Sequence, residues 1–514
     1  MKSNRWRFFV IGLSASFSIS AQAAVTVGSA QFHAKLYSEA LGRIPDQTGW
    51  NSAMTYYAGN PCNAQTLLAQ GVSVLTSSEF SNLTPNNNEK IFKLIRAAFH
   101  RDPNPSEFST LSAQLNSGTT WNSIVQSILT STEFNQRVSI YCGSTPSGWQ
   151  PTMPFNIQST STGSFSDTSG SNLQNLIDQT PPGGTIYLEQ GAIVKLNQSL
   201  ILRQGRTLST VGLPGRRHSG LLGRLVRDSG FNAPLVQLEA GSTLKSVWID
   251  GQKNRFGYSR DAINLNSVGS NIQIIDNLIT DSAGWTNSQY YGSYDDATCS
   301  YGYIGANLIT AYGATHTIPD AHTDGLSVAC ENTTVENNEI IDATDVSIIV
   351  FPATPRQGAA VTQRSIVRNN FALNAGNSAY AAYAVDGLRN RGVSHNFLGT
   401  VFQNNTIWSS PVAHVDIVLA VGTRPWFGST SDIGYGPSFD GNTTGISTVR
   451  GNMGIAVSGM KEVYVQNNVL SFQQVSASPS CPKFNVGAST LDGYASGNIQ
   501  SFIGTVIPAC NWHQ

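Results

Sequence analysis

A short apolar segment that ends in asparagine recurs through the last two thirds of the chain, and it constrains the fold more than any other feature. It occurs at 274–277, 335–338, 367–370, 402–405 and 465–468, as in Val335-Glu336-Asn337-Asn338. The intervals between the final asparagines are 61, 32, 35 and 63 residues, and the long ones are about twice the short ones. The pattern therefore predicts a stacked structural unit of roughly 30 residues.

Asparagine suits such a stack for two physical reasons. It tolerates the left-handed conformation of a sharp corner, and its amide can hydrogen-bond the equivalent asparagine one coil above and below. Coils stacked about 4.8 Å apart bury Ile, Val and Leu in an interior that no single coil can close. The segment 172–514 resembles the pectin-lyase-like right-handed parallel β-helix, and 173–188 resembles its N-terminal cap. A β-propeller or a sandwich is the alternative fold, but neither explains the asparagines.

Residues 30–147 show helical periodicity and an internal repeat. The segment 36–45 matches 91–103 in pattern, and the copies close on Ser77-Ser78-Glu79-Phe80 and Ser131-Thr132-Glu133-Phe134. The pattern resembles the DUF4214 family of small all-α modules, with Leu36, Tyr37, Leu41, Gly42, Arg43, Pro45, Asp46 and Gly49 in the first copy and His100 in place of glycine in the second. We expect an attachment or packing module with Trp50, Phe80 and Phe134 in its core.

The chain divides into four parts on this reading. Lys2, Arg5 and Arg7 precede an apolar run and Ala21-Gln22-Ala23, which predicts a signal peptide at 1–23. An all-α domain at 24–150, a Ser/Thr/Gly/Pro-rich linker at 151–171 and the β-helix at 172–514 follow. No later stretch of about 18 apolar residues predicts membrane insertion. We expect a bacterial protein that is secreted, periplasmic or on the cell surface.

Composition and charge exclude several classes of protein. Charged residues make up 12% of the chain and hydrophobic ones 40%, which is unlike a coiled coil or a charged disordered chain. The formal charge is -1, from 30 Lys and Arg against 31 Asp and Glu. Such a chain has no surplus positive charge for phosphates, so we expect no nucleic-acid partner.

Six cysteines in an exported chain predict disulfides, although the sequence alone allows 15 pairings. Proximity along the chain favours Cys62–Cys142, Cys299–Cys330 and Cys481–Cys510. Free buried cysteines are the alternative. The spacing of cysteines and histidines predicts no metal site.

The segment His322-Thr323-Asp324-Gly325, followed 21 residues later by Asp345, is the strongest candidate for chemistry. It resembles the glycoside hydrolase family 28 enzymes, the polygalacturonases, in which Asn-Thr-Asp-Gly precedes Gly-Asp-Asp-Cys by one coil. The resemblance implies that Asp324 and Asp345 act as general acid and base, with His322 as a proton carrier or a positioning group.

This sequence departs from the family pattern at several points. His322 replaces asparagine, Thr344 or Val346 replaces the second paired aspartate, and no downstream Gly-His-Gly or Arg-x-Lys is present. In the alternative interpretation, Asp324 and Asp342 are turn residues bonded to nearby backbone amides.

Five further residues are candidates for substrate contact: Asp261, Trp285, Tyr303, Asp342 and Arg356. Asp261 occupies the place of Asp324 in its own coil. Trp285 and Tyr303 belong to what we interpret as an aromatic insertion, tethered by Cys299, that either forms a groove wall or packs on itself. Arg356 suits a carboxylated sugar. Ca²⁺ binding by the acidic row is a weaker alternative to a site without cofactors.

The sequence therefore predicts an exported carbohydrate-active enzyme that acts on a polysaccharide, with hydrolysis first. A lyase or C5-epimerase that uses His322, Tyr303 and Arg356 is the second hypothesis. The third is a non-catalytic surface or adhesion protein, in which the β-helix is a rigid rod and the helical module anchors it.

Overall fold

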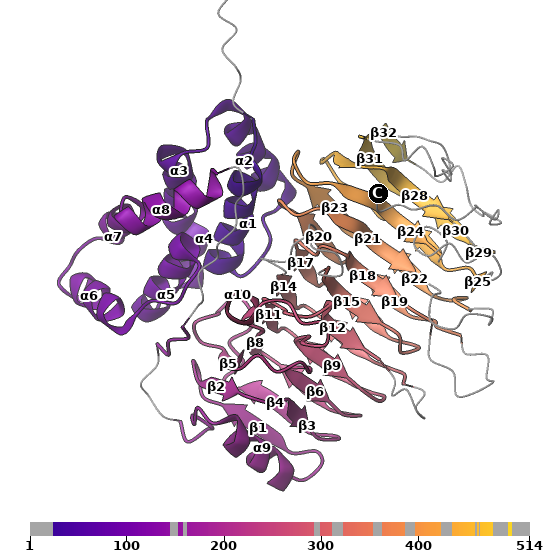
Figure 1. The fold of residues 1–514 in the computed structure, drawn as a ribbon, viewed down its shortest axis with the longest axis horizontal. Helices are drawn as coiled ribbons and strands as arrows, with labels where there is room; N and C mark the ends of the chain where they lie inside the picture. Colours follow the sequence, from indigo (N-terminus) through magenta and orange to yellow (C-terminus); the bar gives the residue numbers. More distant parts are fainter. Residues whose placement is uncertain are drawn as a thin grey trace, which may run out of the picture.

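The computed structural model shows a right-handed parallel β-helix preceded by an all-α section (Figure 1). It describes residues 24–143, 153–157, 162–291, 299–310, 322–352, 362–385, 396–422, 434–457, 460–461, 463–475 and 492–495. The predicted signal peptide and most of the predicted linker lie outside these ranges. No helix in the described ranges is long and apolar enough to cross a membrane.

The helices of the N-terminal section are α1 (Val27–Leu41), α2 (Gln47–Gly59), α3 (Ala64–Leu75), α4 (Ser78–Leu83), α5 (Asn87–Phe99), α6 (Pro105–Asn116), α7 (Trp121–Leu129) and α8 (Thr132–Tyr141). The predicted capping helix follows as α9 (Gly170–Gln179), and Leu173 and Ile177 close the end of the β-helix core. A short helix, α10 (Lys253–Phe256), lies between two coils.

Three long sheets form the walls of the β-helix, and every strand pairing within them is parallel. Sheet A contains β1 (Thr185–Leu188), β4 (Thr207–Thr210), β7 (Thr243–Lys245), β10 (Gln273–Ile275), β13 (Tyr303–Gly305), β16 (Thr334–Glu336), β19 (Ile366–Arg368), β22 (Val401–Gln403), β26 (Ser438–Asp440) and β30 (Tyr464–Gln466). Sheet B contains β2 (Ile193–Leu196), β5 (Gly223–Arg227), β8 (Val247–Asp250), β11 (Leu278–Thr280), β14 (Leu308–Thr310), β17 (Glu339–Ile341), β20 (Phe371–Asn374) and β23 (Thr406–Ser409).

Sheet C contains β3 (Leu200–Leu202), β6 (Val236–Leu238), β9 (Leu265–Ser267), β12 (Thr286–Tyr290), β15 (Asp324–Val328), β18 (Val346–Val350), β21 (Ala379–Val385), β24 (Val415–Val421) and β28 (Met453–Val457). The remaining strands are β25 (Gly434–Tyr435), β27 (Val449–Gly451), β29 (Met460–Lys461), β31 (Val469–Gln474) and β32 (Asp492–Ala495). β32 pairs antiparallel with β31.

The asparagines form the predicted ladder in the turns between sheets A and B. Their side-chain amides are linked at 2.9–3.0 Å in the order Asn277, Asn307, Asn338, Asn370, Asn405, Asn442 and Asn468. Asn307 and Asn442 fill the two double-length intervals, so the predicted coil length is confirmed. All seven side chains are buried.

The structure corrects one part of that prediction. The left-handed conformation belongs to the residue before each ladder asparagine, such as Asn337 with φ 57° and Asn369 with φ 54°, and not to the ladder residue itself. The preceding residue turns the chain at the surface, and the ladder residue then points inward and bonds its neighbours. The left-handed turn and the inward amide hydrogen bonds, which we assigned to one asparagine, therefore belong to two adjacent residues.

The internal repeat of the helical section reflects a repeated ion pair. Arg43 binds both oxygens of Glu79 at 2.8 and 2.7 Å, and Arg101 binds both oxygens of Glu133 at the same distances. Each arginine follows a left-handed helix C-cap, which is Gly42 in the first copy and His100, with φ 56°, in the second. His100 thus keeps the backbone conformation of the glycine that it replaces. Trp50, Phe80 and Phe134 are buried in this section, as predicted.

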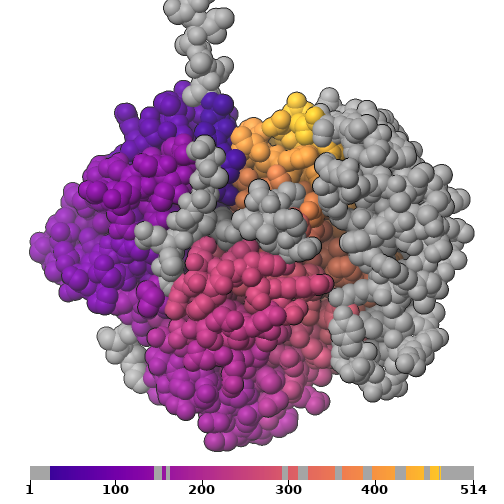
Figure 2. Space-filling model, viewed as in Figure 1, coloured from indigo at the N-terminus to yellow at the C-terminus, as the bar shows by residue number. Residues whose placement is uncertain are grey.

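The helical section packs against the outer face of sheet B. One apolar cluster joins its core to outward residues of that sheet, including Trp248, Leu308 and Trp408. Figure 2 shows the section lying directly against the early coils. The corresponding loops of the two repeat copies contact different strands of sheet B. In the first copy the Ile44 N–H donates to Glu339 of β17, whereas in the second copy Asp102 binds Arg224 of β5, four strands away.

Buried charges at this interface form a chain of ion pairs. Arg96 binds Asp102 at 2.7 Å and Glu39 at 2.6 Å. Arg224 binds Asp102 at 2.7 Å and also pairs with Asp250. The Arg96 and Arg224 guanidinium groups lie over the Trp248 ring at 4.6 and 3.8 Å from its centroid. Each buried charge thus has a partner, without which its desolvation would be costly.

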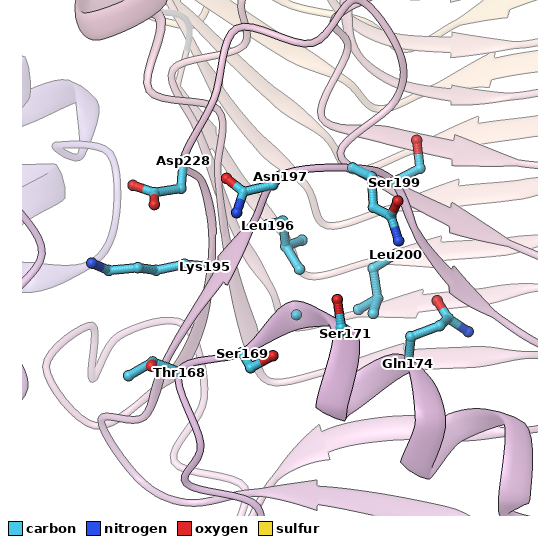
Figure 3. Close-up of a pocket in the computed structure, with 12 residues that line it drawn as sticks. Thr168, Ser169, Ser171, Gln174, Lys195, Leu196, Asn197, Ser199, Leu200 and Asp228 are labelled. Atoms are coloured by element: carbon cyan, nitrogen blue, oxygen red, sulfur yellow. The ribbon is translucent and has the colours of Figure 1, made fainter.

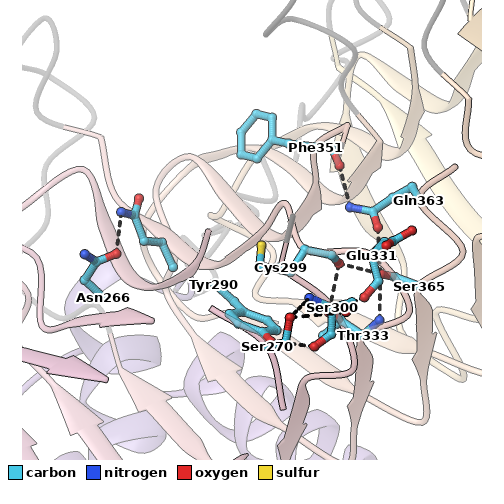
Figure 4. Close-up of a disulfide and its surroundings, with 12 residues drawn as sticks. Asn266, Ser270, Tyr290, Cys299, Ser300, Glu331, Thr333, Phe351, Gln363 and Ser365 are labelled. Atoms are coloured by element: carbon cyan, nitrogen blue, oxygen red, sulfur yellow. Dashed lines mark hydrogen bonds between the residues drawn. A yellow bond between two sulfur atoms is a disulfide. The ribbon is translucent and has the colours of Figure 1, made fainter. Parts of the chain in front are cut away.

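Two predicted disulfides are confirmed, Cys62–Cys142 and Cys299–Cys330. Cys481 and Cys510 lie outside the described residues. The second bond joins neighbouring coils beside Tyr290 and Ser300 (Figure 4).

The described part of the stretch after Trp285 does not form the aromatic insertion that we predicted. It contains β12, β13, β14 and the ladder residue Asn307, which lies 30 residues after Asn277 as in an ordinary coil. Its ladder residue follows Ala306 and not a second polar residue, which hid the repeat in the sequence. Residues 292–298 and 311–321 lie outside the described residues.

Candidate functional site

A row of polar residues lies where the turns from sheet B enter sheet C, which we call the B–C corner. In the register of sheet C, the row comprises Trp285, Thr323, Asp345, Tyr380, Asp416 and Asn452. Backbone hydrogen bonds connect neighbouring members, from Asp345 N–H to the Thr323 carbonyl at 3.2 Å and from Tyr380 N–H to the Asp345 carbonyl at 2.9 Å. We call this set the corner row.

Asp345 and Asp416 are two coils apart in the corner row, with Tyr380 between them. Burial raises the pKa of each carboxyl group to about 7. The next residues of the three strands, Val346, Ala381 and Ile417, belong to one buried apolar cluster on the outer face of sheet C. At a strand spacing of about 4.8 Å, the two backbones are about 9.6 Å apart.

Two histidines flank the acidic residues. His322 Nε2 lies 2.7 Å from the Tyr380 hydroxyl, and their rings meet edge to face at 4.6 Å. His414 Nε2 lies 3.4 Å from an Asp416 oxygen, which also accepts a hydrogen bond from Asn452 at 3.3 Å. His322, Asp345, Tyr380 and His414 are all half-buried and therefore reachable from solvent.

Asp324 lies on the coil next to Asp345 but has different surroundings. It is only 2% exposed. Its carboxylate accepts hydrogen bonds from the Val346 N–H at 3.0 Å and from the Ser327 hydroxyl at 2.7 Å. The Ser327 hydroxyl also lies 2.9 Å from the Thr286 hydroxyl. These bonds hold neighbouring strands of sheet C together, so the structure brings Asp324 and Asp345 close in the stack but commits the first to a backbone contact.

The other predicted contact residues are spread over the molecule. Asp261 is exposed on the B–C corner, and Trp285 is half-buried in the corner row against the apolar cluster. Tyr303 lies on sheet A, where its hydroxyl donates to Glu336 at 2.9 Å. Arg356 lies outside the described residues.

Asp342 faces the helical section and not the corner. Its carboxylate accepts hydrogen bonds from the backbone N–H groups of Ala375, Gly376 and Asn377 at 2.6–3.3 Å and from Gln31 of α1 at 3.3 Å. Burial raises its pKa to about 6. The side chain thus anchors a turn against α1.

Sequence reasoning missed Tyr380, His414 and Asp416. A signal for Asp416 was present, because Asp416 and Asp345 each stand directly before a run of mostly hydrophobic residues, as Asp-Ile-Val-Leu-Ala-Val and Asp-Val-Ser-Ile-Ile-Val. We considered only Asp324, one coil before Asp345, as the second acid, whereas Asp416 lies two coils after Asp345.

A cavity of about 350 Å³ lies at the capped end of the β-helix (Figure 3). Its walls come from the start of α9, the end of β2 and the turn into β3. Mostly small polar side chains line it, with Leu196 and Leu200 as apolar members. Within the part of the chain that the structure describes, no group of three His, Cys, Asp or Glu side chains is arranged to hold a metal ion.

No protein-family model and no curated protein matches the sequence. The resemblances to DUF4214 and to glycoside hydrolase family 28 are therefore not confirmed.

Several solved structures are similar to part of the chain at low identity. One is a tailspike protein of Acinetobacter baumannii bacteriophage Fri1, a capsular polysaccharide depolymerase, at 12% identity and TM-score 0.34 over 60% of each chain. Endo-xylogalacturonan hydrolase from Aspergillus tubingensis matches at 15% identity and TM-score 0.34, over 66% of this chain and 99% of that one.

A mannuronic-acid-specific polysaccharide family 6 lyase from human gut microbiota matches at 10% identity and TM-score 0.31, over 59% of this chain and 58% of that one. The chain thus spans about three fifths of the tailspike and of the lyase. At these scores, the likeness is one of fold.

Proposed function

We propose that the protein is an exported carbohydrate-active enzyme that hydrolyses a polysaccharide with Asp345 and Asp416. The observation that carries the proposal is the placement of two carboxyl groups two coils apart in one row, each with a pKa raised to about 7 by burial. Carboxyl groups with such pKa values, of which Asp345 is half-buried and Asp416 is 8% exposed, suit proton transfer at neutral pH.

The two groups take complementary roles. Near pH 7, one carboxyl group is protonated while the other is ionised. The protonated group gives its proton to the oxygen of the departing sugar. The ionised group removes a proton from a water molecule that attacks the anomeric carbon. A backbone separation of about 9.6 Å is just above the range of about 6.5–9.5 Å between the carboxyl groups of inverting enzymes, which leave room for this water.

Tyr380 lies between the two acids and has a separate role. Its hydroxyl is fixed by His322 at 2.7 Å. In that position it can hydrogen-bond a sugar hydroxyl at the cleavage point without moving a proton itself. His414 and Asn452 orient the Asp416 carboxyl group.

Asp345→Asn and Asp416→Asn variants test the proposal. We expect each to lower kcat by about 10²–10⁴, the usual contribution of a general acid or base. Asp440→Asn, a half-buried aspartate on sheet A, is the matched control and should keep full activity. New reducing ends are measured on a panel of polysaccharides. Full activity in both corner variants would refute the assignment, and binding without any new reducing ends would favour an adhesion protein.

The contact between His322 and Tyr380 favours a second candidate, a lyase or C5-epimerase. A tyrosine held by a histidine at 2.7 Å can exchange the proton next to a uronate carboxyl group. In that case Tyr380→Phe would abolish activity while Asp416→Asn retained it. Lyase chemistry would also produce an unsaturated product, seen as a rise in ultraviolet absorbance that a hydrolase never gives.

A further inference from the structure

The cavity at the capped end offers hydrogen-bonding groups that are not engaged elsewhere. The described residues provide no partner for the side chains of Ser171, Asn197 and Gln198, all of which line it. Ser171 comes from α9, and the two amides come from the turn between β2 and β3 (Figure 3). Its volume of about 350 Å³ lies within the range of small-ligand sites.

The charges around the cavity favour a neutral ligand. Lys195 and Asp228 are the charged lining residues, one of each sign, and Asp228 is also paired with Arg255 at 3.3 Å. Hydroxyl and amide groups both donate and accept hydrogen bonds, as sugar hydroxyls do. Leu196 and Leu200 belong to the β-helix core beneath the cavity and are at most 2% exposed, so the groups open to a ligand are polar. This lining suits an uncharged sugar residue.

The cavity lies on the same edge of the β-helix as the corner row. Asp345 precedes Ile348 of β18 by three residues, and Asn197 precedes Leu200 of β3 by three. The inward residues Ile348 and Leu200 are connected through the register of sheet C. Asn197 therefore continues the corner row five coils before Asp345, at a distance of about 24 Å for a spacing of about 4.8 Å per coil.

Side chains suited to a sugar chain lie along this edge between the two places. Asn232 and Asp261 are exposed on successive coils, and the Asp261 N–H donates to Asn232 at 3.0 Å. Trp285 follows in the corner row on the next coil and is half-buried. A chain along the B–C corner would thus pass polar groups and one indole before it reached Asp345.

We propose that the cavity is a distal subsite for the same substrate, a linear polysaccharide with uncharged sugar residues at this subsite, bound along the B–C corner across five coils. This inference rests on the proposed function for the position of the cleavage point, but binding at the cavity does not depend on the chemistry at Asp345. Distal contacts of this kind strengthen the binding of long chains and do not act on the bond that breaks.

The first test is binding. Wild-type protein and the Asn197→Ala/Gln198→Ala double variant are run in native gels that contain xylan, glucomannan, alginate or polygalacturonate. We expect one of the two neutral polymers to retard the wild-type protein, and the double variant to bind that polymer about tenfold more weakly, as the loss of two hydrogen-bonding amides implies. Gln273→Ala, an exposed amide on sheet A, is the matched control and should bind as the wild type does. Ser171→Trp, which fills the cavity, is a second variant with the same expected loss.

The second test separates this proposal from the proposed function. For the active enzyme, the double variant should raise KM for the polymer about tenfold with kcat unchanged, and should leave kcat/KM for a trisaccharide unchanged. Equal polymer binding by variant and wild type, or no retardation of the wild type by either neutral polymer, would overturn the distal subsite. Full activity of Asp345→Asn together with weakened binding by the cavity variants would overturn the proposed chemistry and leave the subsite standing.

Discussion

Replacement of Asp416 by asparagine should make the protein more stable at pH 8 while it removes activity. Burial raises the pKa of this carboxyl group from 3.8 to about 7, so the folded protein favours its neutral form. The unfolded chain ionises near the ordinary value. The protonated group therefore supports folding below pH 3.8, and this support is lost progressively as the pH rises to about 7. Asparagine stays neutral and avoids the loss.

The size of the effect follows from the two pKa values. A change from 3.8 to about 7 corresponds to about 4 kcal/mol of folding free energy, which is fully expressed above pH 7. The Asp416 side chain keeps 11% exposure, and water around it lowers the measurable part. We expect Asp416→Asn to gain about 2 kcal/mol at pH 8 and nothing at pH 4. Asp345→Asn should also raise the free energy of unfolding at pH 8, but by a smaller amount, because Asp345 is more exposed than Asp416.

Urea unfolding at pH 4, 6 and 8, followed by circular dichroism, measures this gain. Asp324→Asn is the internal contrast. Its carboxylate accepts two hydrogen bonds, and an amide can replace only one of them well, so this variant should lose about 1–3 kcal/mol at pH 8.

Equal losses of stability in the Asp324 and Asp416 variants at pH 8 would refute the reasoning. Asp416 would then be a structural aspartate, and the corner row would lose its general acid. The comparison needs no substrate, so it can be made before the glycan is known.

Three further predictions concern activity and stability. The pH profile of kcat/KM should be bell-shaped with a maximum near pH 7, since both acids have pKa values of about 7; a flat profile between pH 5 and 9 would exclude the pair. Asn338→Ala should cost about 4 kcal/mol in urea unfolding, because it leaves the Asn307 N–H and the Ile304 carbonyl buried without partners. Arg224→Met should cost about 3–5 kcal/mol, because it removes the arginine partner of the buried Asp250 and one of the two arginine partners of the buried Asp102, and differential scanning calorimetry would show a lower Tm.

The coil architecture could be predicted from sequence because the ladder imposes one residue type at one place per coil. From the turn after β10 onward, each turn that leaves sheet A carries an inward asparagine amide, so asparagine recurs there whatever else varies. The coil with Asn307 escaped notice because Ala306 takes the left-handed position there with φ 57°. Of the two positions in each turn, only the one that carries the amide is restricted to asparagine. Single asparagines are common elsewhere in the chain, so one asparagine alone does not mark a coil.

The candidate site was only partly predictable. Asp345 could be singled out by its spacing of 21 residues from Asp324, but the choice between Asp324 and Asp416 as its partner depends on surroundings that sequence spacing does not report. The Asp324 carboxylate accepts hydrogen bonds from Val346 and Ser327, whereas burial raises the pKa of Asp416. Docking of the helical section on sheet B also depends on contacts such as Trp50 Nε1 to the Ser409 carbonyl, 359 residues apart.

The two docking loops of the helical section have a consequence for the order of assembly. The Ile44 N–H pairs with Glu339 on the sixth strand of sheet B, and Asp102 pairs with Arg224 on the second, so these early residues find their partners only after the corresponding coils have formed. Until the second strand of sheet B is in place, Asp102 lacks one of its two arginine partners, which disfavours premature closure of the N-terminal section. Once both loops are seated, opening one part of the stack strains contacts made by the other. The coils of the β-helix otherwise interact only with their neighbours. The helical section links coils that are four strands apart in sheet B and thereby opposes local unfolding of either one.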